Sequence, residues 1–172
     1  SFADTIEPKV NIPSEIVARA MQWDYSAPLP IPEYCKGKAV VKGHVYGVAE
    51  GKTYIVSVSP RGIVDGDSYD SKYKVQCDRN CDFSLEVPLS QSVSPAFVRI
   101  DDTWLVEEIL IENGKTTEIY YDDAYARHEK ALYESKQRYT VVCGPYNDIN
   151  NAFDRQEYSE IFFDRFADRQ GR

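Results

Sequence analysis

Short segments in which apolar and polar residues alternate occupy the middle of the chain, and they constrain the fold more than any other feature. Successive side chains of a β-strand point to opposite faces of a sheet, so this alternation is typical of strands with one buried face. Segments with this pattern, or rich in the β-branched and aromatic residues that strands favour, are 39–48, 53–59, 72–76, 83–87, 96–100, 104–111 and 116–121. Turn-forming residues separate several of them, as at 50–52, 101–103 and 113–114. The pattern predicts a mainly β fold, an antiparallel β-sandwich of about seven strands.

The part of the chain before these segments has a different character. Residues 1–37 predict an irregular N-terminal extension because five prolines interrupt it, although one short helix is expected with Ser14 as its N-cap. Residues 38–122 form the expected β-sandwich domain. Its first segment carries Gly43 and Gly47, which predict a bulge or a close backbone contact.

The part after the sandwich changes character again. Residues 123–172 predict a charged linker, a candidate last strand at 139–142 and a C-terminal helix that begins at Asn147. Aromatic residues recur along that helix at a spacing of four, which places them on one face. This candidate interaction surface would dock on the chain's own sandwich or on another domain or subunit, and its residues are Tyr158, Phe162 and Phe166.

Charge and hydropathy limit the partners of the chain. Twenty basic and 28 acidic residues give a net charge of −8, which repels phosphate backbones, so no nucleic acid is expected to bind. No apolar run approaches the roughly 20 residues of a transmembrane helix, so no membrane-spanning segment is expected. Ser1 opens a polar segment and not a secretory signal. Because the chain starts without Met, we expect that a signal peptide or lipid anchor has been removed.

Four cysteines are the first candidates for chemistry. Cys77 and Cys81 are separated by three residues, one more than in the redox pairs of thioredoxin-type proteins. If they lie at opposite ends of a hairpin turn, their separation fits a structural disulfide, with free thiols and a redox or metal role as the alternatives. A second bridge between Cys35 and Cys143 would tie the N-terminal extension to the start of the last helix.

The remaining candidate sites have simpler structural explanations. His44 and His128 are expected to be hydrogen-bonded or solvated imidazoles. The acidic loop 65–70 lacks the full ligand pattern of an EF-hand, so a solvated loop is favoured over a calcium site. The paired carboxylates at 101–102 and 122–123 fit turn residues better than a catalytic pair. Neither a catalytic residue nor a cofactor or metal site is therefore predicted.

Four segments, taken in order, resemble a known family. They are KAVVKGHVYG at 38–47, CDFSLEVP at 81–88, ILIENGKTTEIYYD at 109–122 and VVCGPYNDINN at 141–151. This order is similar to that of the N-terminal β-sandwich region of TlpA-type thioredoxin-like thiol-disulfide reductases from gut Bacteroidetes. The resemblance implies a signal peptide or lipoprotein anchor before the sandwich and a thioredoxin domain after it. The Trp-Cys-x-x-Cys motif of that domain is absent from this chain, so the resemblance does not transfer oxidoreductase activity.

These observations together lead to two hypotheses about function. The first is a non-catalytic accessory module of a periplasmic or envelope-associated protein, with a thioredoxin domain or another protein as its partner. The second is a stand-alone extracytoplasmic domain that binds a glycan or a peptide. An enzyme with a spatially assembled site is the least favoured reading, and the oligomeric state is left open.

Overall fold

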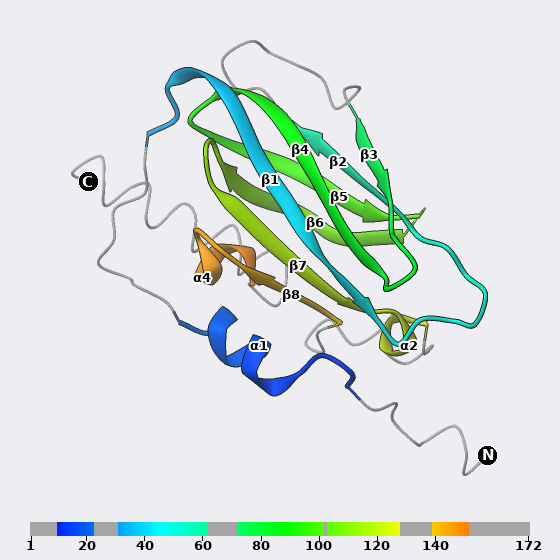
Figure 1. The fold of residues 1–172 in the computed structure, drawn as a ribbon. Helices are drawn as coiled ribbons and strands as arrows, with labels where there is room; N and C mark the ends of the chain where they lie inside the picture. The colour runs from blue at the N-terminus through cyan, green and yellow to red at the C-terminus, as the bar shows by residue number, and fades with distance from the viewer. Residues whose placement is uncertain (1–9, 23–30, 62–71, 102, 128–138, 152–172) are drawn as a thin grey trace.

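The computed structural model describes residues 10–22, 31–61, 72–101, 103–127 and 139–151, which form two packed β-sheets with short helices beside them (Figure 1). In chain order the elements are α1 (Ser14–Ala20), β1 (Tyr34–Tyr46), β2 (Ile55–Pro60), β3 (Tyr73–Gln76), β4 (Asp82–Gln91), β5 (Val93–Ile100), β6 (Thr103–Glu112), β7 (Thr116–Asp122), α2 (Asp123–Ala126), β8 (Thr140–Cys143) and α4 (Asn147–Asn150).

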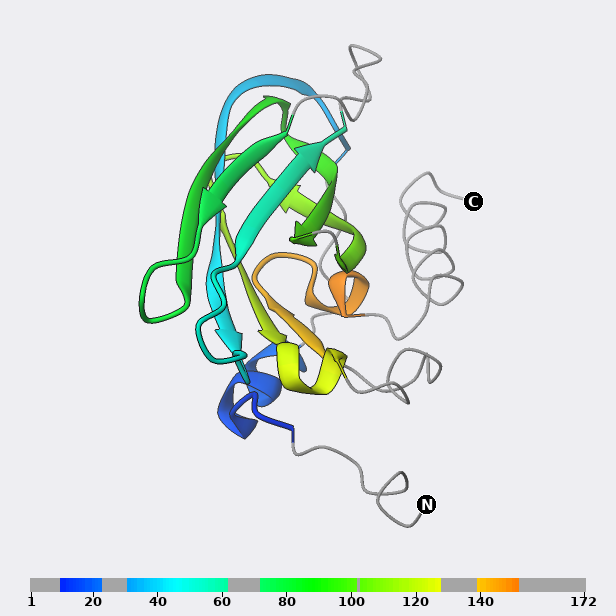
Figure 2. The same cartoon turned by 90° about the vertical axis from the view of Figure 1, so that its right-hand side faces the viewer.

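The strands divide equally between the two sheets. Sheet A has the order β4, β1, β7, β8, and sheet B has the order β3, β2, β5, β6. Figure 1 looks onto sheet A with sheet B behind it, and Figure 2 shows the same molecule turned to the side. The predicted mainly β sandwich is confirmed, and so is its candidate last strand, which is β8.

One strand pairing departs from the predicted antiparallel arrangement. β1 and β7 run parallel, beginning with Val40 opposite Thr116. The connection before β7 crosses from sheet B to sheet A through a turn at Gly114, whose φ of 80° suits glycine. The Gly114 N–H donates to the Lys38 carbonyl, so β7 starts beside the early part of β1 and follows its direction.

The core lies between the sheets and contains the inward-facing residues of each strand. In β4, buried and exposed residues alternate along most of the strand. Fully buried aliphatic residues such as Val41 and Ile119 in sheet A face Val56 and Ile109 in sheet B. Each contributes about 1.5–3 kcal/mol relative to an exposed position.

Gly43 allows β1 and β7 to approach closely. A Cβ atom at this position would lie 1.7 Å from the Ile119 carbonyl oxygen and 2.9 Å from the Phe83 ring. No other residue fits without moving the backbone of β7. The close backbone contact predicted from the glycines of this segment is therefore confirmed at Gly43.

The connection between β3 and β4 is not the predicted hairpin of paired strands. β3 belongs to sheet B and β4 to sheet A, so residues 77–81 cross between the sheets. The turn is nevertheless tight, because Cys81 N–H donates to the Asp78 carbonyl and Asp78 N–H donates to the Asp82 carbonyl, both at 2.9 Å. By contrast, the turn at Asp101 joins the paired strands β5 and β6 as predicted.

The N-terminal helix packs against sheet A. α1 begins after Pro13, which takes the N-cap position that we expected for Ser14 and provides no side-chain cap. Ile12 and Ala20 are buried against Val141 and Cys143 of β8. The described part of the predicted irregular extension is therefore an ordered edge of the sandwich.

Three asparagines join the two sheets at one edge, and we call Asn147, Asn150 and Asn151 the asparagine clasp. Asn150 Oδ1 accepts from Leu110 N at 2.8 Å, and its Nδ2 donates to Leu110 O at 3.0 Å. Asn151 contacts the backbone of Val142 in the same way, at 2.8 and 2.6 Å. β6 and β8 are the edge strands of sheets B and A, so each amide pairs with backbone groups of one edge.

Asn147 completes the clasp by contacting the N-terminal helix. Its Oδ1 accepts from Gly144 N at 2.8 Å, and its Nδ2 donates to the carbonyls of Arg19 and Gln22 at 3.3 and 3.4 Å. Carbonyls at the end of α1 and just after it are thereby connected to the β8–α4 turn. The clasp is a structural element, and it occupies the last of the four segments that carry the family resemblance.

The predicted C-terminal helix is described only at its start. α4 begins at Asn147 as predicted and ends at Asn150, with Asn151 at its C-cap, and the rest of the predicted helix lies outside the described residues. The candidate interaction surface lies outside the described residues, and so do His128 and the acidic loop 65–70. The predictions for these positions stay predictions.

Candidate functional site

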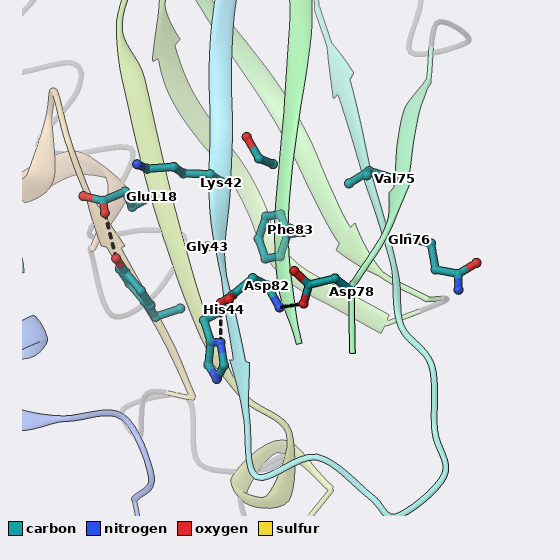
Figure 3. A pocket seen from close by; sticks show the side chains of 11 residues that line it. Lys42, Gly43, His44, Val75, Gln76, Asp78, Asp82, Phe83 and Glu118 are labelled. Atoms are coloured by element: carbon teal, nitrogen blue, oxygen red, sulfur yellow. Dashed lines mark hydrogen bonds and ion pairs between the residues drawn. The ribbon is translucent and has the colours of Figure 1, made fainter. Parts of the chain in front are cut away.

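A shallow depression of about 510 Å³ lies on the outer face of sheet A, towards the end of β3 (Figure 3). Alternation along β1, β4 and β7 places their polar residues outward, because the intervening residues face the core. The polar residues contributed by these three strands are Lys42, His44, Asp82, Ser84, Glu118 and Tyr120. The depression is therefore built mainly on regular strands, and Asp78 of the β3–β4 turn also lines it.

A hydrogen-bonded pair of His44 and Asp82 lies at one end of the depression. The two residues are opposite each other in the register of β1 and β4, and His44 Nδ1 lies 2.6 Å from Asp82 Oδ1. The ring of Tyr46 contacts the imidazole edge-on, with ring centroids 4.3 Å apart. Together these contacts fix the imidazole plane. The predicted hydrogen-bonded imidazole is confirmed for His44, and its partner was not identified from the sequence.

The β3–β4 turn holds Asp82 in place. Asp78 Oδ1 accepts from the backbone N–H groups of Asn80 and Asp82, at 2.8 and 3.0 Å. These bonds fix the first residue of β4 and thus the carboxylate that faces His44. Figure 3 shows Asp78 and Asp82 side by side at this end of the depression.

A closed ring of hydrogen bonds joins Arg19, Glu118 and Tyr120. Arg19 Nη1 donates to Glu118 Oε2 at 3.0 Å and its Nη2 donates to the Tyr120 hydroxyl at 3.2 Å. The Tyr120 hydroxyl in turn donates to Glu118 Oε1 at 2.7 Å. The ring links α1 to β7 beside the depression.

Contacts between Glu118, Tyr120 and Arg19 set the protonation states of Glu118 and Tyr120. Burial and the bond to Glu118 raise the pKa of Tyr120 to about 12. Burial alone would raise the pKa of Glu118, but hydrogen bonds from Tyr120 and Arg19 outweigh it and lower that pKa. Glu118 is therefore a carboxylate and Tyr120 a neutral phenol at neutral pH.

Lys42 adds a positive charge between the two groups. It is exposed, lies opposite Ser84 in β4 and Glu118 in β7, and extends towards Glu118 in Figure 3. Ser84 is thus placed opposite Lys42 and not opposite His44. The depression offers hydrogen-bond donors and acceptors of both charges within one fixed surface, which suits non-covalent binding of a polar ligand.

The predicted disulfide between Cys77 and Cys81 is not formed in the structure, where all four cysteines are free thiols. Cys77 is buried just after β3, and burial raises the pKa of its thiol to about 11. Cys81 is partly buried, and both side chains pack against the main core.

The second bridge, which the sequence left open, is not formed. Cys143 lies opposite Glu118, which lies opposite Lys42 of β1, whereas Cys35 is seven residues earlier in that strand. Seven residues of a strand span about 23 Å, well beyond the reach of a disulfide. Cys143 is instead buried under α1, and its Sγ lies 3.7 Å from the Ile16 carbonyl oxygen.

The carboxylates at 122–123 form a buried hydrogen-bonded junction between β7 and α2. Asp122 accepts from Asn11 N at 2.6 Å, from Asn11 Nδ2 at 3.0 Å and from Tyr125 N at 3.1 Å. Asp123 accepts from the Tyr54 hydroxyl at 2.5 Å and from Arg127 Nε at 2.8 Å. Their predicted role in chain turning fits the N-cap position of Asp122, but their burial and their partners were not predicted.

Within the described residues, no group of three or more His, Cys, Asp or Glu residues is arranged to hold a metal ion. No helix in the same part of the chain is long and apolar enough to span a membrane.

Comparisons with known proteins give little further information. No family model matches the chain, and no curated protein does. One solved structure, a putative cell adhesion protein from Bacteroides ovatus, overlaps with a TM-score of 0.27 and 12% identity. The overlap covers 51% of this chain and 39% of that one, too distant a match to carry an argument. The likeness to TlpA-type reductases, unsupported by any family model, therefore stays a resemblance.

Proposed function

We propose that this chain is a non-catalytic interaction module of an extracytoplasmic, envelope-associated protein, and that the depression on sheet A binds its partner. The observation that carries the proposal is the His44–Asp82 pair beside the Arg19–Glu118–Tyr120 ring. All of these side chains except Arg19 of α1 are oriented on strands, yet they face outward and lie outside the core between the sheets.

The charges of the depression indicate the chemistry of the partner. Lys42 supplies positive charge, and Asp78, Asp82 and Glu118 supply negative charge. Arg19 of α1 adds a positive charge beside the depression, where it pairs with Glu118. A protein segment that carries both charges is the favoured occupant, because complementary pairs give specificity and orientation more than raw affinity. The envelope location and a thioredoxin-like partner domain are supported by the resemblance of the four segments alone.

A glycan is the second candidate ligand, and one observation favours it. The rings of His44 and Tyr46 adjoin the polar residues of the depression, with the phenol of Tyr120 nearby. Aromatic side chains that present an apolar body and a polar tip, together with fixed polar groups, suit the mixed surface of a sugar.

Binding assays with matched variants test the proposal. The purified chain is screened against a linear peptide library and a glycan array, and each hit is titrated with the wild type, His44→Ala and Lys42→Ala. Lys38→Ala is the control, since Lys38 lies on the same face of β1 but pairs with Glu86 outside the depression. We expect a loss of affinity of tenfold or more for the two depression variants and none for the control.

Two outcomes would contradict the proposal. One is the absence of any hit, or hits whose affinity is indifferent to both depression variants. The other is catalytic turnover by the purified chain, measured as insulin reduction or hydrolysis of generic esters. A peptide hit would favour the interaction module, whereas a glycan hit would favour the second candidate.

A further inference from the structure

We propose that the partner of the depression binds as an added β-strand along the free edge of β4, as an extended peptide segment with a basic side chain opposite Ser84. This inference rests on the proposed function, because the edge and the depression share lining residues, and it specifies how the partner binds. An extended peptide that pairs with a sheet edge gains affinity from main-chain hydrogen bonds and specificity from alternate side chains.

The register of β1 and β4 shows which backbone groups of β4 face away from β1. Val45 lies opposite Cys81 in this register, and its N–H donates to the Cys81 carbonyl at 3.0 Å. Hydrogen-bonded pairs recur at every second residue of an antiparallel ladder, so the odd-numbered residues of β4 bond to β1. The N–H and C=O groups of Ser84 and Glu86 therefore point towards the free edge.

The two ends of this edge are closed, and its middle is open. At Asp82, the Asp78 carboxylate accepts the edge-facing N–H at 3.0 Å, and the Asp78 N–H donates to the carbonyl at 2.9 Å. At Pro88 there is no N–H to donate. Within the described residues, no hydrogen bond engages the edge-facing backbone groups of Ser84 and Glu86. Each of these two residues thus offers one donor and one acceptor.

The opposite edge of the sandwich is covered at the corresponding groups. Asn150 pairs with both backbone groups of Leu110 in β6, and Asn151 pairs with those of Val142 in β8. Such cover is common in native proteins, because open edge groups pair with other chains. On the side without the clasp, β3 has 4 residues and β4 has 10, so β4 is the longer template for a further strand.

The depression reaches this edge. Its lining includes Ser84 of β4 together with Val75 and Gln76 of β3, so it extends from the outer face of sheet A to the side where β4 and β3 are the edge strands (Figure 3). Tyr73 and Val75 pack against the core but are only partly buried. An apolar side chain opposite Leu85 would point inward on this side of the sandwich, as Leu85 does, and would add to their cover.

The charges beside the open groups favour a basic side chain. On the outer face, a residue added opposite Ser84 has Asp82 and Glu86 as its diagonal neighbours, within reach of a long side chain. Lys38 pairs with Glu86 at 3.0 Å, and Lys42 lies opposite Ser84, but both lysines belong to β1 on the far side of β4. The carboxylates of β4 are therefore nearer to the added side chain than the lysines of β1.

A designed peptide, acetyl-Thr-Ile-Thr-Val-Lys-amide, tests the inference. In antiparallel pairing its lysine lies opposite Ser84, its valine opposite Leu85 and its second threonine opposite Glu86. Titration into the isotopically labelled full chain, followed by NMR, measures both the affinity and the exchange of single amides. We expect saturable binding that slows amide exchange at Ser84 and Glu86 by about tenfold or more. Exchange at Leu85 should not change, because its N–H bonds to β1 with or without the peptide.

N-methylated peptides separate backbone pairing from side-chain recognition. Methylation of the lysine or second-threonine backbone nitrogen removes a donor that faces β4, whereas the valine nitrogen faces away from it. We expect the first two changes to weaken binding by about tenfold or more and the third by no more than about twofold. In the protein, Ser84→Pro should weaken binding because it removes the edge-facing N–H, whereas Ser84→Ala keeps that group and should bind as the wild type does.

The outcomes distinguish this inference from the proposed function. The added strand is overturned, and the proposed function stands, if the peptide binds with equal sensitivity to methylation at all three positions and loses affinity in His44→Ala or Lys42→Ala. The same follows if library peptides bind the depression but the designed peptide does not. Amide protection at Ser84 that rises with protein concentration alone would identify a second copy of the chain as the occupant and overturn the inference. If neither the designed peptide nor any library member binds, both proposals fail.

Discussion

The asparagine clasp and the depression on sheet A are both polar, but their side chains are paired in opposite ways. In the clasp, buried amides of Asn150 and Asn151 bond to the backbone of the two edge strands. In the depression, His44 bonds to Asp82 and Glu118 bonds to Tyr120, and all four are at least partly exposed.

This difference indicates that the polar groups of the clasp stabilise the fold, whereas those of the depression contribute little to its stability. A buried backbone group that loses its partner has no water to replace it, so deleting a clasp amide should cost stability. An exposed pair that is broken regains hydrogen bonds to water, so deleting it should cost little.

Asn151→Ala should lower the free energy of unfolding by about 3 kcal/mol, because the buried N–H and C=O groups of Val142 lose their partner. Urea unfolding followed by tryptophan fluorescence or circular dichroism measures the change. Asn113→Ala is a matched control, since the Asn113 amide donates one exposed bond to the Cys35 carbonyl. A loss for Asn151→Ala no larger than for this control would show that the clasp does not hold the sheets.

Asp122→Ala should cost about 2 kcal/mol, because the variant removes the acceptor of the Asn11 and Tyr125 backbone N–H groups. The loss should be accompanied by faster amide exchange in α1, which the Asn11 contact anchors near sheet A. Hydrogen exchange measured by NMR checks this coupling. Unchanged exchange in α1 beside a clear loss of global stability would refute the proposed anchoring.

Glu118 should make the stability depend on acid pH, but only slightly. Its folded pKa lies below the ordinary value of 4.5, so its stabilising contribution is complete above that pH and is lost as the pH falls through the folded pKa. We expect about 0.5 kcal/mol, because the pair with Arg19 is half-exposed and screened by solvent. Urea midpoints at neutral pH and near pH 3 should differ less for Glu118→Gln than for the wild type, and equal differences would remove this assignment.

Local patterns in the sequence predicted the strands well but not their partners. Alternation in 83–87 identified β4, and the mixed run from Ala39 identified β1, since each depends on neighbouring residues alone. The crossing of 77–81 between sheets and the parallel pairing of β1 with β7 depend on contacts between distant residues. No local pattern contains that information.

The candidate site was beyond sequence reasoning for the same reason. His44 and Asp82 are 38 residues apart and meet only through the register of β1 and β4. A signal was present at the clasp, where three asparagines cluster within 147–151, but their amides could equally have faced solvent. Burial decided their role, and burial is a property of the assembled sandwich.

The most direct test of the contrast between clasp and depression is the stability of a double variant, His44→Ala with Asp82→Ala. Both residues belong to the depression and bond to each other, so removing them together leaves neither one without its partner. Urea unfolding should give a free energy within about 0.5 kcal/mol of the wild type. A loss of about 2 kcal/mol or more would show that the pair holds the fold, and it would contradict the assignment of this surface to binding.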